Sequence, residues 1–152
     1  MPLDASFVGR TWAPETYEVS LEKIREFATA VGADDPVHHD RDAARAAGHP
    51  DVVAPTTFAV VFTWPATRRV LDDPALGLDF SRVVHRDQSI EVARPLHAGD
   101  VVTTVVAVDD IRELAGKDVI TFRCDVTDDD GAEVLTSRAT LVGRAEPEGG
   151  GQ

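Results

Sequence analysis

The sequence has little cysteine and no long hydrophobic run. Its single cysteine, Cys124, cannot form an internal disulfide, and it alternates with other apolar residues in a strand-like pattern, so we expect it to be buried. No stretch approaches the roughly 20 apolar residues that a transmembrane helix needs, and the first ten residues lack the basic and apolar segments of a signal peptide. These absences predict a soluble, cytoplasmic protein.

Basic residues are also few, because 15 Lys and Arg stand against 27 Asp and Glu and give a formal net charge of -12. Such a charge repels phosphate backbones and anionic lipid surfaces unless a local basic patch intervenes, and the sequence contains no such patch. We therefore expect neither nucleic acid nor membrane as a partner. With 152 residues, of which 43% are hydrophobic, the chain has the size and apolar content of one domain.

Two helical patterns flank a bend near the N-terminus. Apolar residues recur at helical spacing over 21–31, with Ser20 placed to cap the start and Gly32 to end the helix. A shorter helix is predicted over 41–47. The bend between them, DDPVHHD, contains a proline that keeps its carboxylates and histidines off a helical face. Bends held between rigid elements often carry binding and catalytic groups.

The segment 56–71 is apolar nearly all round until Arg68, which is typical of a helix buried on most sides. We expect Thr56 or Thr57 to cap its start, and Pro65 to kink the helix or to end its first half.

β-rich runs dominate the second half of the chain. After an extended lead-in or first strand at 11–19, four such runs are predicted at 83–95, 100–114, 117–128 and 132–144. Their short separations favour antiparallel neighbours. Helices followed by strands, with one helix too apolar for a surface, predict an α+β fold in which an antiparallel sheet wraps the buried helix. The tail, 145–152, is expected to be disordered.

Several of these stretches resemble a known family. The chain is similar to the MaoC-like hot-dog dehydratases, and in particular to their N-terminal-type, FAS1-like dehydratase branch with the UPF0336 group. The likeness is carried, in this order, by FVGR, EKIREFATAVG, DDPVHHD, GHPDVVAPTTF, VVHRDQSIEVARPLHAGD and RATLVGR. It implies one hot-dog domain over 1–144, with an antiparallel sheet around a long central helix. The group includes non-catalytic-type subunits of (3R)-hydroxyacyl-thioester dehydratases.

The resemblance also marks candidate catalytic residues. Family members with the full hydratase motif carry G-D-x-N-P-[LIV]-H, whose aspartate and histidine together activate water and move the C2 proton. The matching residues here are Gly32, Pro36, Val37 and His38. However, Ala33 stands at the aspartate and Asp35 at the asparagine. The predicted catalytic residues are therefore His38 with Asp34 or Asp35 as a substitute partner; otherwise His38 only fixes the bend and the aspartates cap backbone N–H groups.

The start of the long helix is the predicted substrate-binding region, because its first N–H groups are free and can meet a thioester oxygen. The residues assigned to it are Val53, Ala54, Thr56 and Thr57, with Trp64 placed beside an acyl channel by resemblance; the alternatives are an ordinary capped helix start and plain core. A metal site is not expected. Its candidate ligands would be His38, His39, Asp40 and His49, but adjacent histidines on a bend rarely aim both rings at one ion.

Two functions remain open. The favoured one is a subunit of a (3R)-hydroxyacyl-thioester dehydratase, or (R)-specific enoyl-thioester hydratase, in fatty-acid-type metabolism, which shapes the acyl channel for a catalytic partner. The alternative is a self-sufficient enoyl-CoA hydratase that uses His38. A hot-dog thioesterase has weaker support. The expected partners are an acyl-CoA or acyl-carrier-protein thioester and either a second copy or a MaoC-like catalytic subunit. No cofactor is expected, since proton transfer and loss of water need no redox chemistry.

Overall fold

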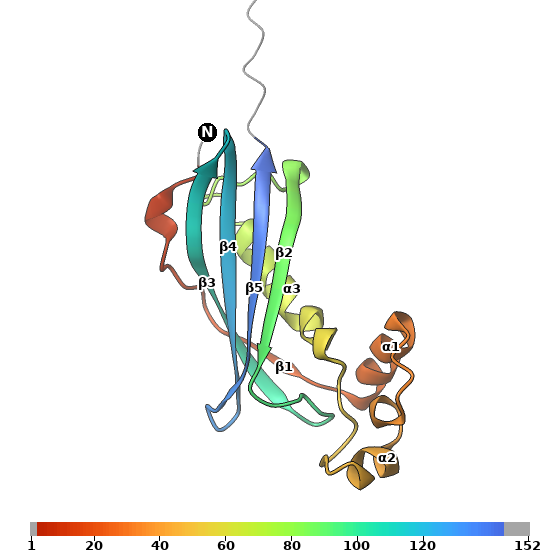
Figure 1. Ribbon diagram of the computed structural model, residues 1–152. Helices are drawn as coiled ribbons and strands as arrows, with labels where there is room; N and C mark the ends of the chain where they lie inside the picture. Colours follow the sequence, from red (N-terminus) through yellow and green to blue (C-terminus); the bar gives the residue numbers. More distant parts are fainter. Residues whose placement is uncertain (1–2, 145–152) are drawn as a thin grey trace, which may run out of the picture.

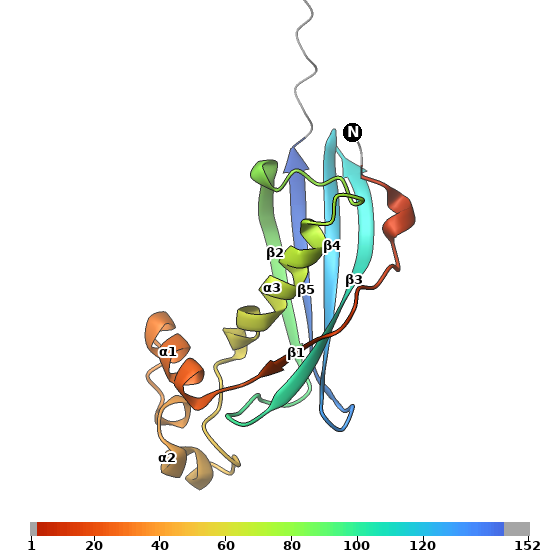
Figure 2. The same cartoon turned by 180° about the vertical axis from the view of Figure 1, so that it is seen from behind.

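The computed structural model describes residues 3–144, which form a five-stranded antiparallel sheet curved around one long helix (Figures 1 and 2). This arrangement confirms the predicted α+β fold. The tail predicted over 145–152 lies outside the described residues. None of the helices within 3–144 is long and apolar enough to cross a membrane.

The elements follow each other in the predicted order. The helices are α1 (Leu21–Val31), α2 (Arg41–Ala46) and α3 (Val60–Leu71), with short 3-10 turns at Ala5–Phe7, Pro36–His38, Thr56–Ala59 and Phe80–Arg82. The strands are β1 (Glu15–Glu18), β2 (Val83–Val92), β3 (Val101–Leu114), β4 (Lys117–Asp128) and β5 (Glu133–Arg144). Helices α1 and α2 lie together beyond one end of the sheet, beside the start of the central helix (Figure 1).

The strand order is β1-β3-β4-β5-β2. The last three strands pair as consecutive antiparallel neighbours, as predicted. The prediction was wrong for β2, which pairs with β5 instead of with β3. The segment that leaves β2 does not turn back as a hairpin, because it pairs elsewhere: His97 bridges Val53, and Leu96 O accepts the N–H of Ala54. Strand β2 is therefore one edge of the sheet.

Local signals place α1 where the sequence predicts it. Ser20 Oγ accepts the N–H of Lys23 at 3.1 Å, and Gly32 ends the helix with a φ of 72°, a left-handed conformation that glycine adopts without steric cost. The extended lead-in is shorter than predicted. It contributes the four residues of β1 and an isolated bridge between Thr11 and Ala107.

The central helix differs from its prediction at two points. Its start is the 3-10 turn Thr56–Ala59, whose N-cap is Pro55 without a side-chain hydrogen bond, so neither threonine caps it. The helix also runs through Pro65 to Leu71. Pro65 is exposed, so the carbonyl oxygen that loses its N–H partner lies on the side of the helix open to water.

The core forms two clusters along α3. One lies near the helical end of the molecule and contains Ile24, Phe58 and Val126; the other contains Val70, Phe122 and Leu141 and lies toward the opposite end. Cys124 belongs to the second cluster and is 3% exposed, which confirms its predicted burial.

Candidate functional site

The histidine-containing bend is a 3-10 turn, Pro36–His38, that links α1 to α2. Asp35 caps this turn by accepting the N–H of Val37 at 3.1 Å, and Asp40 caps α2 by accepting the N–H of Ala43. Asp35 thus has the capping role that was predicted as the alternative to catalysis, and Asp40 has the same role at α2, where no cap was predicted. The capped turn fixes the direction in which the histidines leave the backbone.

His38 is anchored from one ring nitrogen. Its Nδ1 lies 2.7 Å from the carbonyl oxygen of Val53, and because a carbonyl only accepts, Nδ1 carries the proton. In the neutral ring the other nitrogen, Nε2, is then a hydrogen-bond acceptor. The turn is tied to the same segment a second time, since Val53 donates its N–H to Val37 O at 2.9 Å. His38 therefore has a fixed orientation and tautomer, as a general base needs.

His39 turns toward the position where the hydratase motif has its aspartate. Its Nε2 lies 2.7 Å from Ala33 O, and its own carbonyl accepts from Arg25 Nε at 2.8 Å. Ala33 in turn donates its N–H to Ala28 O. The backbone at this position is thus held from both sides, but the side chain is a methyl group.

The two candidate carboxylates do not join His38. Asp34 and Asp35 are both exposed, and Asp35 is occupied by its cap. Among the described residues, no carboxylate is hydrogen-bonded to His38. The substitute dyad with Asp34 or Asp35 stays a prediction, and it would need the bend to move.

A cavity of about 370 Å³ opens beside His38. The predicted substrate-binding residues that line it are Val53, Ala54 and Thr56; Thr57 is exposed in the adjoining turn and is not among the lining residues. The other walls come from His49, Pro55, Val92, Arg94, Pro95, Leu96 and Leu135. The bend, the start of the central helix and the ends of β2 and β5 therefore meet at one site.

Arg94 and His49 belong to this cavity but were not predicted as substrate-binding residues. Arg94 makes a bidentate pair with Asp100 at 3.0 and 3.1 Å, and these bonds raise the pKa of Arg94 above its ordinary value. Asp100, which is 8% exposed, also accepts the N–H of His97 at 2.9 Å. The ion pair fixes the loop that carries Leu96. A charged residue directly before a proline, with an acid six residues later, was the available signal.

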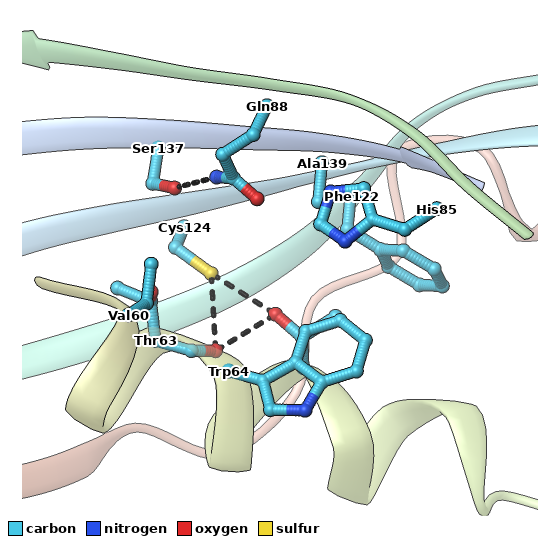
Figure 3. A pocket seen from close by; sticks show the side chains of 10 residues that line it. Val60, Thr63, Trp64, His85, Gln88, Phe122, Cys124, Ser137 and Ala139 are labelled. Carbon is cyan, nitrogen blue, oxygen red and sulfur yellow. Dashed lines mark hydrogen bonds between the residues drawn. The ribbon is translucent and has the colours of Figure 1, made fainter. Parts of the chain in front are cut away.

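A second cavity, of about 200 Å³, lies between α3 and the sheet. Trp64, which was predicted to lie beside an acyl channel, lines this cavity and stacks on His85 with ring centroids 5.8 Å apart (Figure 3). His85 is exposed, and its ring packs against Trp64 at the cavity's edge.

Cys124 lines the same cavity but is a poor nucleophile, because burial raises the pKa of its thiol. We expect a thiol reagent such as Ellman's reagent to label the native chain at least about tenfold more slowly than the urea-unfolded chain. Absorbance of the released thiolate measures both rates. Equal rates in the two states would show that the thiol is accessible and ionised in the fold.

Metal-binding geometry is not built around the bend. Among residues 3–144, three possible ligand atoms come within 4.8 Å of one another only at Asp128, Asp129 and Asp130. Asp128 there accepts the N–H groups of Asp130 and Ala132, which is ordinary turn chemistry. The histidines of the bend instead direct their anchored ring nitrogens at backbone carbonyls.

Comparison with known proteins places this geometry in context. Residues 6–137 match the family described as FAS1-like, dehydratase domain region. A UPF0336 protein of Saccharopolyspora erythraea is 51% identical over 153 residues, which cover 98% of each chain. A UPF0336 protein of Streptomyces avermitilis is 50% identical and covers 98% of this chain and 100% of the relative.

Solved structures are similar as well. A chain of the C-terminally truncated HadBC complex of Mycobacterium tuberculosis, described as a (3R)-hydroxyacyl-ACP dehydratase, is 30% identical with a TM-score of 0.82, over 90% of this chain and 97% of that one. A MaoC-like dehydratase is 33% identical with a TM-score of 0.85; the match covers 93% of this chain and 43% of that one. This chain thus spans less than half of that dehydratase.

Proposed function

The chain belongs to the FAS1-like dehydratase family and, within it, to the UPF0336 group, and we propose that it is a subunit of a (3R)-hydroxyacyl-thioester dehydratase. In this role it shapes the acyl channel, and a MaoC-like partner supplies the complete pair of aspartate and histidine. The substrate is an acyl thioester of coenzyme A or of an acyl carrier protein, and the setting is fatty-acid-type metabolism in the cytoplasm.

One observation carries the proposal: the bend has the histidine of the motif without its acid. Ala33 has no ionisable side chain, and the neighbouring aspartates are exposed, with Asp35 engaged in capping. Dehydration removes a proton from C2 and releases the C3 hydroxyl as water, which needs an acid-base pair within reach of both positions. This chain offers His38 alone, so the partner's pair performs the proton transfers.

The chain's own contribution is to bind and orient the thioester. The turn Thr56–Ala59 has no side-chain cap, and its first N–H groups can donate to a thioester carbonyl oxygen. Val53 and Ala54 form the adjoining wall. The acyl chain then runs beside α3 toward Trp64. Holding the substrate in one orientation lowers the barrier even when the chemistry is done by another subunit.

Strand β2 is the proposed docking edge for the second subunit. It is ten residues long, has no strand partner on its outer side within residues 3–144, and carries exposed Val84 (52%) and Val92 (45%). An open edge with exposed β-branched residues favours pairing with another strand. In the proposed assembly the partner is a MaoC-like catalytic subunit, whereas a second copy would suit a self-sufficient hydratase. The HadBC relative is itself described as a complex.

A second candidate function is a self-sufficient enoyl-CoA hydratase. The observation in its favour is the anchored His38, whose protonated Nδ1 leaves Nε2 as an acceptor. In this mechanism Nε2 takes a proton from water as the oxygen adds to C3, and Asp34 or Asp35 would have to move within hydrogen-bond distance of the same water.

Hydration of a trans-2-enoyl-CoA by the purified chain separates the two functions. Loss of enoyl absorbance gives the rate, and His38→Ala serves as the matched variant. We expect the chain alone to show no activity above the His38→Ala background. Activity that falls about a hundredfold or more in the variant would instead establish the self-sufficient hydratase.

A further inference from the structure

The cavity under α3 is lined by most of the polar side chains that are buried in the described part of the chain. Five polar or charged side chains are buried in the described part of the chain, and three of them, Thr63, Thr67 and Ser137, line this one cavity at 4%, 2% and 3% exposure. The buried Cys124 joins them. An acyl channel for plain hydrocarbon needs none of these groups, since a buried hydroxyl that meets only hydrocarbon costs free energy.

On the helix side of the cavity the threonine hydroxyl protons are already used in hydrogen bonds, whereas the hydroxyl oxygens can still accept. Thr63 Oγ1 donates to Ala59 O and Thr67 Oγ1 donates to Thr63 O, both at 2.9 Å. Because the Thr67 proton is used in this way, the single thiol proton of Cys124 is donated either to Thr67 Oγ1, 3.3 Å from Sγ, or to Thr63 O at 3.9 Å. The threonine oxygens can still accept a hydrogen bond.

Strands β2 and β5 supply the other polar groups of the cavity. Gln88 Nε2 donates to Ser137 Oγ at 2.7 Å, which leaves the O–H of Ser137 free to donate. The carbonyl oxygen of Gln88 points from β2 toward α3 (Figure 3). One donor and several acceptors thus face the same space. A hydroxyl group, which both donates and accepts, complements this arrangement better than a methylene group does.

The remaining lining is mostly apolar. It consists of Val60, Trp64, Phe122 and Ala139, with the exposed His85 at the edge of the cavity. At about 200 Å³ the space is smaller than the roughly 300–1,000 Å³ of drug-sized sites, so it admits a slim chain.

The cavity and the thioester site are two separate spaces along the same elements. Both are lined by the central helix with its first turn, β2 and β5, and they share no lining residue. At 1.5 Å per residue, Thr63 lies about 10 Å along the helix from Thr56. Ile90 lies between Gln88 and Val92 on the same face of β2 and is partly buried in the core, so it stands between the two cavities. An acyl chain that is bound at Thr56 and continues along this face of β2 passes Ile90 before its distal part reaches the polar cavity.

We propose that this cavity selects acyl chains that carry a hydroxyl group in their distal part, held between Ser137, Gln88 and Thr67. The inference rests on the proposed acyl-binding function and specifies its substrate class. An unsubstituted chain displaces water from these groups without replacing its hydrogen bonds, whereas a hydroxylated chain replaces them.

Isothermal titration calorimetry of the purified full chain tests this specificity. The probes are dodecanoyl-CoA and hydroxydodecanoyl-CoA isomers that carry the hydroxyl at successive positions of the distal half. We expect at least one isomer to bind about three- to tenfold more tightly than dodecanoyl-CoA, as one or two neutral hydrogen bonds allow.

Two variants assign the preference to the cavity. Gln88→Leu and Ser137→Ala should each reduce the ratio of hydroxydodecanoyl-CoA to dodecanoyl-CoA affinity to less than about twofold. Ser89→Ala, on the other face of β2, is the matched control and should keep the preference. Equal or weaker binding of every hydroxy isomer, or a preference that survives both variants, overturns the inference alone. Failure to bind any of these thioesters overturns the proposed acyl-binding function as well.

Discussion

The double variant Ala33→Asp with Asp35→Asn is expected to hydrate a trans-2-enoyl-CoA about a hundredfold faster than the parent chain. General acid-base catalysis contributes roughly 10²–10⁴-fold when the pair is positioned, and this variant restores both acid and asparagine of the motif. The position is ready to hold a side chain, because Ala33 N bonds Ala28 O and Ala33 O bonds His39 Nε2 at 2.7 Å. Asparagine at 35 can keep the cap on Val37.

The control for this gain is Ala33→Asn with Asp35→Asn, which has nearly the same shape but no carboxylate. We expect it to stay at the parent's rate. Adding His38→Ala to the active variant should remove the gain, since the aspartate and histidine act as one unit. A gain of similar size in the Asn control would mean that the carboxylate is not the missing group.

Phe58→Ala is expected to lower the free energy of unfolding by about 3–5 kcal/mol, with a fall in melting temperature of roughly 6–20 °C. Phe58 is 0% exposed and lies at the start of the central helix. Its ring meets Phe27 edge-on, with centroids 5.5 Å apart, and Phe62 at 6.5 Å. The substitution thus removes the contact that holds α1 against the central helix, as well as leaving a cavity.

Urea unfolding followed by far-UV circular dichroism measures this loss. Val31→Ala is the matched control, because Val31 belongs to α1 but is 53% exposed. We expect its effect to remain within about 0.5 kcal/mol. If Phe58→Ala were as mild as this control, Phe58 would not join the two parts of the molecule.

The sequence predicted those features that depend on local chemistry. The cap at Ser20 and the left-handed Gly32 bound α1 as expected, since each signal acts within a few residues. The β-rich runs became strands for the same reason. The pairing of β2 with β5 was missed, because a strand's partner depends on where the intervening segment packs, and alternation of side chains carries no such information.

The candidate site likewise has parts that the sequence predicted and parts that it did not. The anchoring of His38 on Val53 and the meeting of both with Arg94 bring together three segments that lie far apart in the sequence. Resemblance to the family pointed to His38, and the free N–H groups at the start of the long helix pointed to Val53, but no periodicity pointed to Arg94. The sequence did not predict the polar cavity, for a related reason. Thr67, Gln88 and Ser137 come from three different elements, and each is unremarkable in its own segment.

The central claim is that this chain binds and orients the thioester while its partner performs the proton transfers. The most direct test is enoyl-CoA hydration by the co-purified pair of this chain and a MaoC-like partner with the intact motif, with one histidine removed at a time. We predict that His38→Ala in this chain lowers kcat less than about threefold, and that removing the partner's motif histidine lowers it at least about a hundredfold. The reverse pattern, with the large loss from His38→Ala, would contradict the claim.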